Sequence, residues 1–183
     1  MWQLFRQIVH AGIPTEAAPQ PNDAGLTGHE HEHENEHKHE HEKIQADILA
    51  VLGRALCIRE VDAGSCNACE LEIQALSNPY YNIEGLGIKF VASPRHADML
   101  MVTGPVSKNM EAALKLAYDA MPHPKLVVAI GECACTGGVF GESYASCGRV
   151  SNVIPVDVTV PGCPPPPIEI LRGILTAISA KSQ

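Results

Sequence analysis

The chain has 183 residues and a formal net charge of −8 at pH 7, and 45% of its residues are hydrophobic while only 4% are aromatic. That length suits one domain with a tail or an insert, and the low aromatic content predicts a mainly aliphatic core. The negative charge argues against nucleic-acid binding, which would require a basic face.

Seven cysteines occur in the chain, and this odd number argues against a complete set of disulfides. The first residues lack the basic leader and the sustained apolar core of a secretory signal, and no apolar run approaches the ~20 residues needed to span a bilayer. We therefore expect a cytoplasmic protein, in which clustered cysteines bind metal more often than they form cross-links.

Residues 1–43 are predicted to precede the folded domain. Residues 1–10 form a short amphipathic segment that packs on protein or, alternatively, touches a membrane surface. Residues 11–43 form a linker with a disordered tract in which imidazoles alternate with carboxylates. This tract either binds a divalent metal such as Ni, Zn or Cu, or is a solvated spacer that binds metal only incidentally. Its candidate ligands are His29, His31, His33, His37, His39 and His41.

From residue 44 onward, strand and helix patterns alternate, which predicts an α/β domain over residues 44–183. The apolar run at 125–130 is typical of a central strand in a parallel sheet. We expect an open, mainly parallel, flavodoxin-like sheet flanked by helices. The predicted strands are 57–62, 87–92, 98–103, 125–130 and 156–160, and the predicted helices are 44–52, 70–77, 107–121 and 168–180.

Four cysteines stand in loops that directly follow predicted strands. Cys66 and Cys69 follow the first strand, Cys133 follows the fourth, and Cys163 follows the last. In open α/β sheets, ligands bind outside the carboxyl ends of the strands, so these loops can converge on one point. Four thiolates meeting there match the ligation of a [4Fe–4S] or [2Fe–2S] cluster.

Small and acidic residues surround these cysteines. The glycines permit positive φ and close backbone approach, so that backbone N–H groups can point at cluster sulfurs. Three acidic neighbours, Glu70, Glu72 and Glu132, either lower the potential of a nearby cluster or are solvated surface charges. The glycines are Gly131, Gly137, Gly138 and Gly162.

Zinc binding and thiol redox chemistry are the alternatives for these cysteines. A lone Cys-x-x-Cys also fits a thioredoxin-type pair or half of a zinc site. Zinc sites usually contain a second closely spaced pair of ligands, whereas Cys133 and Cys163 are far apart in the sequence. A redox-active Cys66–Cys69 pair would assign no role to Cys133 and Cys163. Cys57, Cys135 and Cys147 are expected to be small buried hydrophobes, with Cys135 also conceivable as a substitute ligand.

Five motifs together resemble a known protein family. They are Val61-Asp62 with Cys66-Asn-Ala-Cys-Glu-Leu-Glu72, Gly87-Ile-Lys89 with Ser93-Pro-Arg-His-Ala-Asp98, Thr103-Gly-Pro-Val106, Gly131-Glu-Cys133 with Gly137-Gly138, and Pro155-Val-Asp-Val158 with Pro161-Gly-Cys-Pro-Pro165. They resemble the small, cluster-bearing subunit of membrane-bound [NiFe] hydrogenases of the formate hydrogenlyase and energy-converting type. That subunit is homologous to the 20-kDa-type subunit of respiratory complex I. The resemblance runs from about Cys57 to Ile178.

The resemblance implies a function for the chain. In that family the cysteines matching Cys66, Cys69, Cys133 and Cys163 ligate one [4Fe–4S] cluster, proximal to the Ni–Fe site of a large subunit. We therefore expect an electron-transfer subunit of a membrane-associated hydrogenase that interconverts H⁺ and H₂, with no catalytic residue in this chain. The implied partners are the large subunit, a ferredoxin-like iron–sulfur subunit and membrane subunits. The implied location is peripheral, on the inner face of the membrane.

Departures from the pattern bear on the choice of branch. Complex I subunits carry two adjacent cysteines in the first loop, whereas Ser65 stands beside Cys66 here, and this favours a hydrogenase. Leu71 occupies the position where hydrogenases often carry a proton-transferring Glu, so that role does not carry over. The chain ends at Gln183 without the motifs for further clusters, so one cluster is expected. The alternatives are a complex-I-like subunit of an NADH/quinone oxidoreductase and a non-enzymatic metal-binding accessory protein.

Overall fold

The computed structural model describes residue 46 and residues 54–181. The amphipathic segment 1–10, the tract with its six imidazoles and most of the predicted helix 44–52 lie outside the described residues. Residue 46 is helical. The predictions for residues 1–43, and the domain boundaries drawn from them, therefore stay predictions.

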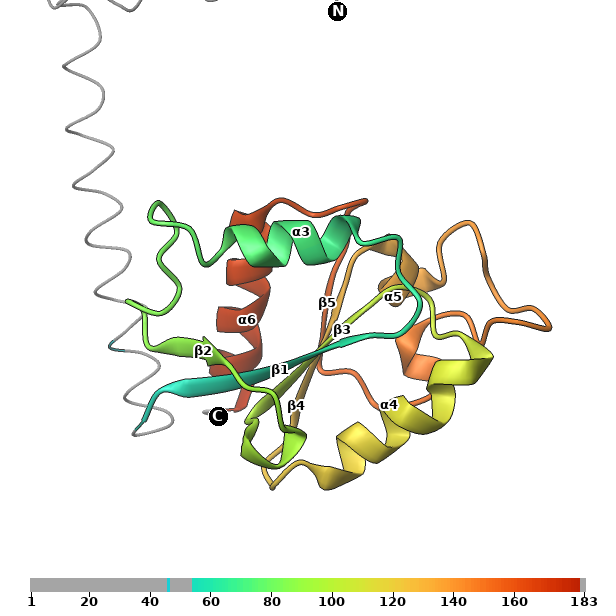
Figure 1. Cartoon of the computed structure of the whole chain (residues 1–183), viewed down its shortest axis with the longest axis horizontal. Helices are drawn as coiled ribbons and strands as arrows, with labels where there is room; N and C mark the ends of the chain where they lie inside the picture. The colour runs from blue at the N-terminus through green and yellow to red at the C-terminus, as the bar shows by residue number, and fades with distance from the viewer. Residues whose placement is uncertain (1–45, 47–53, 182–183) are drawn as a thin grey trace, which may run out of the picture. The chain divides into compact units, whose positions relative to one another are not determined.

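Five strands form an all-parallel sheet in the order β2-β1-β3-β4-β5 (Figure 1). This is the strand order of flavodoxin-like folds, in which the order reverses between β1 and β3. The α/β class and the flavodoxin-like sheet are confirmed, and the described sheet is wholly rather than mainly parallel. The strands are β1 (Leu56–Asp62), β2 (Ile88–Phe90), β3 (Met99–Thr103), β4 (Leu126–Ile130) and β5 (Val158–Val160).

Helices cover both faces of the sheet (Figure 1). Side chains of α3 (Ala68–Ala75) and α6 (Pro167–Lys181) pack on one face, and those of α4 (Lys108–Ala120) and the short α5 (Glu132–Thr136) pack on the other. Two 3₁₀ turns, η1 (Pro94–His96) and η2 (Val150–Asn152), precede β3 and β5. None of the helices in the described range is long and apolar enough to cross a membrane.

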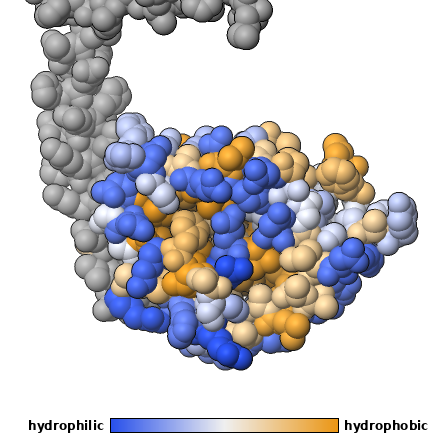
Figure 2. Space-filling view, in the orientation of Figure 1, coloured by the Kyte–Doolittle hydropathy of each residue, from blue (hydrophilic) through white to orange (hydrophobic). Residues whose placement is uncertain are grey.

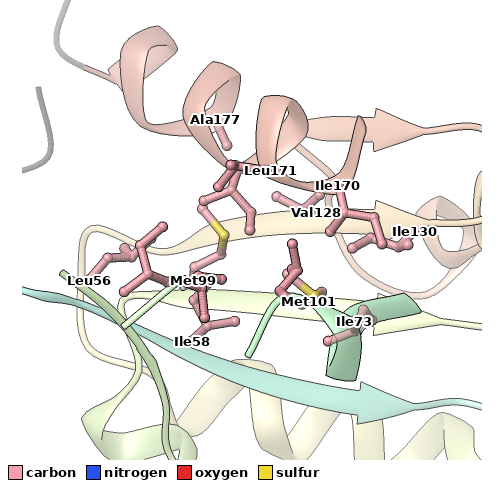
Figure 3. Close-up of a cluster of buried hydrophobic side chains, with 14 of the residues drawn as sticks. Leu56, Ile58, Ile73, Met99, Met101, Val128, Ile130, Ile170, Leu171 and Ala177 are labelled. Atoms are coloured by element: carbon pink, nitrogen blue, oxygen red, sulfur yellow. The ribbon is translucent and has the colours of Figure 1, made fainter. Parts of the chain in front are cut away.

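Successive side chains of the central strands point to opposite faces of the sheet, and they form two hydrophobic cores, one on each face. On β3, Met99 and Met101 point toward α3 and α6, whereas Leu100 and Val102 point toward α4 and α5. Figure 3 shows Met99 and Met101 on the side of the sheet that carries Leu171 of α6. Every residue of β3 and β4 is buried, as expected of central strands in a parallel sheet. Each fully buried Leu, Ile or Met contributes about 1.5–3 kcal/mol, so the two cores fix the sheet between its helices.

The strand register brings four strand ends into one row. Asp62 of β1 pairs with Thr103 of β3, Thr103 pairs with Ile130 of β4, and Ile130 pairs with Val160 of β5. We call this row, with the loops that leave it, the carboxyl edge. All four candidate cluster ligands follow strands that end here, so the expected placement of their loops is found.

Candidate metal centre

Backbone contacts join the three cysteine-bearing loops at the carboxyl edge. Gly131 N–H donates to the carbonyl of Val160 at 2.8 Å, and Glu132 N–H donates to the carbonyl of Gly162 at 2.7 Å, which links the loops after β4 and β5. The loop after β1 reaches the same place. A Cβ atom added to Gly131 would lie 2.5 Å from the Sγ of Cys69, so that thiol lies against the backbone that precedes Cys133.

Asp62 holds the first loop in its conformation. Its Oδ1 accepts hydrogen bonds from the N–H groups of Gly64 and Ser65, both at 2.7 Å, and the Ser65 hydroxyl accepts one from Asn67 N–H at 3.1 Å. Gly104, in the loop after β3, has a φ of +73°, and a Cβ there would clash with the Ser65 backbone. The Val-Asp and Thr-Gly motifs thus shape the loop that carries the Cys-x-x-Cys pair.

Helix α3 begins inside the Cys-x-x-Cys pair. Asn67, which precedes the helix, has a φ of 71°, in the left-handed region, and its carbonyl accepts the first helical bond from Leu71 N–H at 3.2 Å. The N–H groups at the start of the helix have no acceptor within it and carry the positive end of the helix dipole. Cys69 is the second residue of this helix and therefore lies in its first turn.

The loop after β4 packs closely around Cys133. A Cβ added to Gly138 would lie 2.9 Å from the Sγ of Cys133, so only glycine leaves room for this approach. The Thr136 hydroxyl donates to the Glu132 carboxylate at 2.8 Å and accepts from Gly138 N–H at 3.2 Å. Thr136, which has no role in the sequence motifs, therefore pins the loop that surrounds Cys133.

The four candidate ligands lie close enough to influence one another electrostatically. Burial, and after it negative charge on Glu70, Cys66, Cys133 and Cys163, raises the pKa of the Cys69 thiol to about 12. The pKa of Cys133 is also raised, by burial and then by charge on Cys163 and Cys66. These thiols hold their protons at neutral pH until a cation replaces them, so metal binding at this site releases protons.

The other three cysteines differ from these four in hydrogen bonding. Each donates its S–H to a protein oxygen, and Cys57 and Cys147 are buried as expected of small hydrophobes. Burial and the charge of Glu132 raise the pKa of Cys135 to about 11, and its thiol points back to β4 rather than joining the four. Between residues 54 and 181, no hydrogen bond of this kind is made by the four candidate ligands. The other three cysteines donate as follows: Cys57 to the Ala55 carbonyl at 3.9 Å, Cys135 to the Ala129 carbonyl at 3.6 Å, and Cys147 to Glu111 Oε2 at 3.3 Å.

The sequence did not reveal that a carboxylate is buried beside the thiols. Glu70 is only 7% exposed, and neither of its oxygens has a hydrogen-bond partner among the described residues. The hydroxyl of Thr103, which is fully buried at the end of β3, is likewise unpartnered there. Leu71, at the position where hydrogenases often carry a Glu, points outward and is 58% exposed. Glu70 is therefore not a solvated surface charge.

The donor set fits a cluster better than a single ion. Among the described residues, no three His, Cys, Asp or Glu side chains are arranged to hold one metal ion. Zinc needs its ligands at about 2.0–2.3 Å from a single point, whereas a cluster spreads its thiolates over several iron atoms. Four thiols around two glycine-lined approaches, at Gly131 and Gly138, match that wider arrangement.

The fold and the site define a class of protein, a flavodoxin-like α/β subunit whose functional loops gather at the carboxyl edge. The family model described as "NADH ubiquinone oxidoreductase, 20 Kd subunit" matches residues 66–177, which is more than half of the chain. The chain belongs to this family of oxidoreductase subunits, and the resemblance expected from its motifs is confirmed.

Individual relatives agree with the family assignment. The chain is 47% identical over 133 residues to the "Probable membrane-bound hydrogenase subunit mbhJ" of Pyrococcus furiosus, covering 73% of this chain and 80% of that protein. It is 39% identical over 140 residues to "Formate hydrogenlyase subunit 7" of Escherichia coli, covering 76% of this chain and 55% of that protein. A chain from the archaeal membrane-bound sulfane sulfur reductase superposes with a TM-score of 0.60 at 31% identity, covering 69% of this chain and 70% of that one.

Proposed function

We propose that this chain is the electron-transfer subunit of a membrane-associated hydrogenase that interconverts H⁺ and H₂. It holds one [4Fe–4S] cluster through Cys66, Cys69, Cys133 and Cys163, next to the Ni–Fe site of a partner large subunit. The observation that carries the proposal is the division among the seven cysteines. Three donate S–H bonds into the fold, whereas these four come from three loops at one edge and influence one another's charge.

The chain's own residues bind and shield the electron carrier. A [4Fe–4S] cluster at this position would supply one-electron transfer. Cys69 lies in the first turn of α3, and the glycine approaches at Gly131 and Gly138 bring backbone close to the sulfurs of Cys69 and Cys133. The buried Glu70 lies near Cys69, and an ionised carboxylate at this place would disfavour an added electron and so favour the low potential that proton reduction requires.

The surface around the thiols suits docking of a large subunit. The loop after α5 exposes three large apolar side chains, Val139 at 95%, Phe140 at 61% and Tyr144 at 98%. Figure 2 shows a small apolar area at the upper right, where Figure 1 draws the first part of this loop, whereas the outermost tip is pale blue. Aromatic residues are rare in this chain, at 4%, and exposed aromatics are typical anchors of protein interfaces. We call these three side chains, which follow Cys133 in the chain, the apolar rim; Leu71 on α3, which follows Cys69, is also exposed.

Spectroscopy of cysteine variants tests the ligand assignment. We expect the reduced, anaerobically purified chain to give the EPR signal of one [4Fe–4S] cluster, whereas zinc would give none. Substituting any of the four ligands with Ser, as in Cys69→Ser, should abolish or strongly alter the signal. Cys147→Ser is the matched control and should retain it. Retention in Cys69→Ser, with loss in Cys147→Ser, would show that the ligands are wrongly assigned.

A quinone-linked complex is the second candidate, because the family description names an NADH–ubiquinone oxidoreductase subunit. Assays of the intact complex separate the two activities. H₂ evolution from a reduced viologen is expected of the hydrogenase, and quinone-dependent turnover without H₂ would favour the rival. In either complex, we place the chain peripherally on the inner face of the membrane, next to a ferredoxin-like iron–sulfur subunit and membrane subunits.

Divalent-metal binding by the imidazole tract is a separate proposal. The tract from His29 to His41 carries six imidazoles, which suit Ni²⁺. A Ni²⁺ titration should give a lower stoichiometry for a variant lacking residues 29–42 than for the full chain. An unchanged stoichiometry would reject the tract as a metal site and with it the idea of a nickel-handling accessory protein.

A further inference from the structure

A pocket opens at the end of the sheet opposite to the cysteines. Its volume is about 610 Å³, within the range of about 300–1,000 Å³ that is usual for binding pockets. We call this end, where β1, β3 and β4 begin, the amino edge. The floor of the pocket includes the apolar side chains Cys57 and Val91, and its basic lining residues are Arg54, Lys89, Arg95 and His96.

The basic side chains come from three separate segments. Arg54 precedes β1, Lys89 lies in the edge strand β2, and Arg95 belongs to η1 before β3. Folding therefore brings together cations that are far apart in the sequence. Cations gathered around one hollow repel one another, and an anion bound there would offset that repulsion.

The nearby carboxylate is already engaged. Asp98 is 7% exposed, accepts a hydrogen bond from Cys57 N–H at 3.0 Å and forms an ion pair with Arg54. The side chains of Lys89, Arg95 and His96 make no hydrogen bond or ion pair in the described part of the chain. No acidic residue is among those that line the pocket within that part. Arg54 thus has a counter-charge within the chain, whereas Lys89 and Arg95 have none in the described part.

We propose that this pocket binds an acidic segment of a partner subunit, with Asp or Glu carboxylates facing Lys89 and Arg95. The proposal rests on the proposed function in that it requires a multisubunit complex. A protein segment suits the site better than a lipid surface. An anionic membrane would repel the net negative charge of the whole chain, whereas a short segment senses mainly charges within the Debye length of about 8 Å.

Zero-length cross-linking of the intact membrane complex tests the proposal. A water-soluble carbodiimide joins a lysine amine to a contacting carboxylate as an amide, without a spacer. We expect peptide mass spectrometry to find such an amide between Lys89 and an Asp or Glu of another subunit. Lys89→Arg keeps the charge but cannot form the amide, so it should retain the complex and lose the cross-link. Absence of any Lys89 cross-link to another subunit in the wild-type complex would overturn the proposal.

Charge reversal supplies a second measurement. Lys89→Glu with Arg95→Glu should lower the fraction of the chain retained with the membrane subunits about tenfold or more. The matched control, Lys115→Glu with Arg172→Glu on the exposed sides of α4 and α6, should behave as wild type. Equal retention of both double variants would overturn the proposal. So would charge-dependent binding to phosphatidylglycerol vesicles without a protein cross-link, which would identify a lipid surface.

The EPR signal separates this proposal from the proposed function. Both charge-reversal variants should keep the cluster signal of the wild type, because neither pair of positions lies at the carboxyl edge. A wild-type complex without the cluster signal but with the Lys89 cross-link would reject the electron-transfer role and support the docking role. A cluster signal without the cross-link would support the electron-transfer role and reject the docking role.

Discussion

The two edges of one sheet carry opposite chemistry. The carboxyl edge gathers thiols, glycines and carboxylates, whereas the amino edge gathers basic side chains around an apolar floor. Strand β1 connects them. Cys57 lies in the basic pocket and Asp62 holds the thiol loop, five residues and about 16 Å along the strand. The parallel topology makes this possible, because all strand starts fall on one edge and all strand ends on the other.

Packing around glycines also differs between the edges. Gly131 at the carboxyl edge and Gly87 before β2 have similar φ values of +88° and +80°. An added Cβ would meet the Cys69 sulfur at Gly131, but it would meet nothing within 4 Å at Gly87. Gly131 also has a ψ of 156°, in a region that essentially only glycine adopts, so a side chain there meets both backbone strain and the Cys69 thiol.

Alanine substitution at these glycines should give the largest difference between the edges. Gly131→Ala is expected to abolish cluster binding, because the new methyl group occupies the place of the Cys69 thiol. Gly87→Ala should keep the cluster and lower the free energy of unfolding by about 1–2 kcal/mol, the usual cost of a left-handed non-glycine residue. Iron and sulfide content together with urea unfolding measure both effects. Equal cluster content in the two variants would show that close packing at Gly131 is not needed for cluster binding.

The apolar rim of the carboxyl edge should dominate binding of the large subunit. Phe140→Ala with Tyr144→Ala is expected to weaken that binding roughly 100-fold, because exposed aromatic anchors typically contribute about 1–3 kcal/mol each. The free energy of unfolding of the isolated chain should change by about 0.5 kcal/mol or less. Leu116→Ala, at an apolar residue 70% exposed on α4, is the control and should bind normally. Normal binding by the aromatic double variant would place the interface elsewhere.

Two aspartates that each accept backbone hydrogen bonds provide a matched pair. Asp62 accepts two N–H bonds at 2.7 Å at the carboxyl edge, and Asp157, just before β5, accepts one from Val127 N–H at 2.7 Å. Both are exposed, so Asp62→Ala and Asp157→Ala should each lower the free energy of unfolding by about 1–2 kcal/mol. Only Asp62→Ala should also shorten the lifetime of the cluster towards a chelator, by about tenfold, because it loosens the loop of the Cys-x-x-Cys pair. Equal lifetimes in the two variants would show that Asp62 does not support the site.

Much of the carboxyl edge could be predicted from the sequence. Apolar runs located each described strand and long helix to within two residues at either end, and the thiols directly followed predicted strands. The short helix α5 was not predicted, because five residues show no helical periodicity and Gly131 and Gly137 enclose them. The burial of Glu70 was also missed, since nothing local distinguishes it from Glu72, which is only partly buried.

The amino edge was far less predictable. Lys89, Arg95 and Arg54 look like ordinary surface charges when each is read with its sequence neighbours. Only the register of β1 with β2 and β3 brings them around one hollow. Asp98 belongs to a family motif, yet in the structure it bonds Cys57 N–H and Arg54 at the amino edge, away from the thiols. The loops after the strands could be predicted from local motifs, whereas the basic pocket at the amino edge can be recognised only in the tertiary structure.

The smallest predicted effect tests whether crowding of carboxylates costs stability at the carboxyl edge. Glu60 of β1 is half-buried, and its pKa is raised above 4.5 by burial, then by charge on Glu70 and Asp62, with Arg59 opposing. The unfolded chain therefore loses this proton at a lower pH than the folded chain. Between those two pKa values, unfolding releases a proton, so rising pH destabilises the folded state until Glu60 is fully ionised.

Glu60→Gln removes that penalty. The variant should be slightly more stable than wild type at pH 8, by under about 1 kcal/mol because the site is partly solvated, and the advantage should shrink as pH falls toward 4.5. Urea unfolding of the cluster-loaded protein between pH 5.5 and pH 8 measures the trend. A variant less stable than wild type at pH 8 would mean that ionised Glu60 has a favourable partner. In that case the ionised acidic groups near the thiols would stabilise the folded state rather than destabilise it.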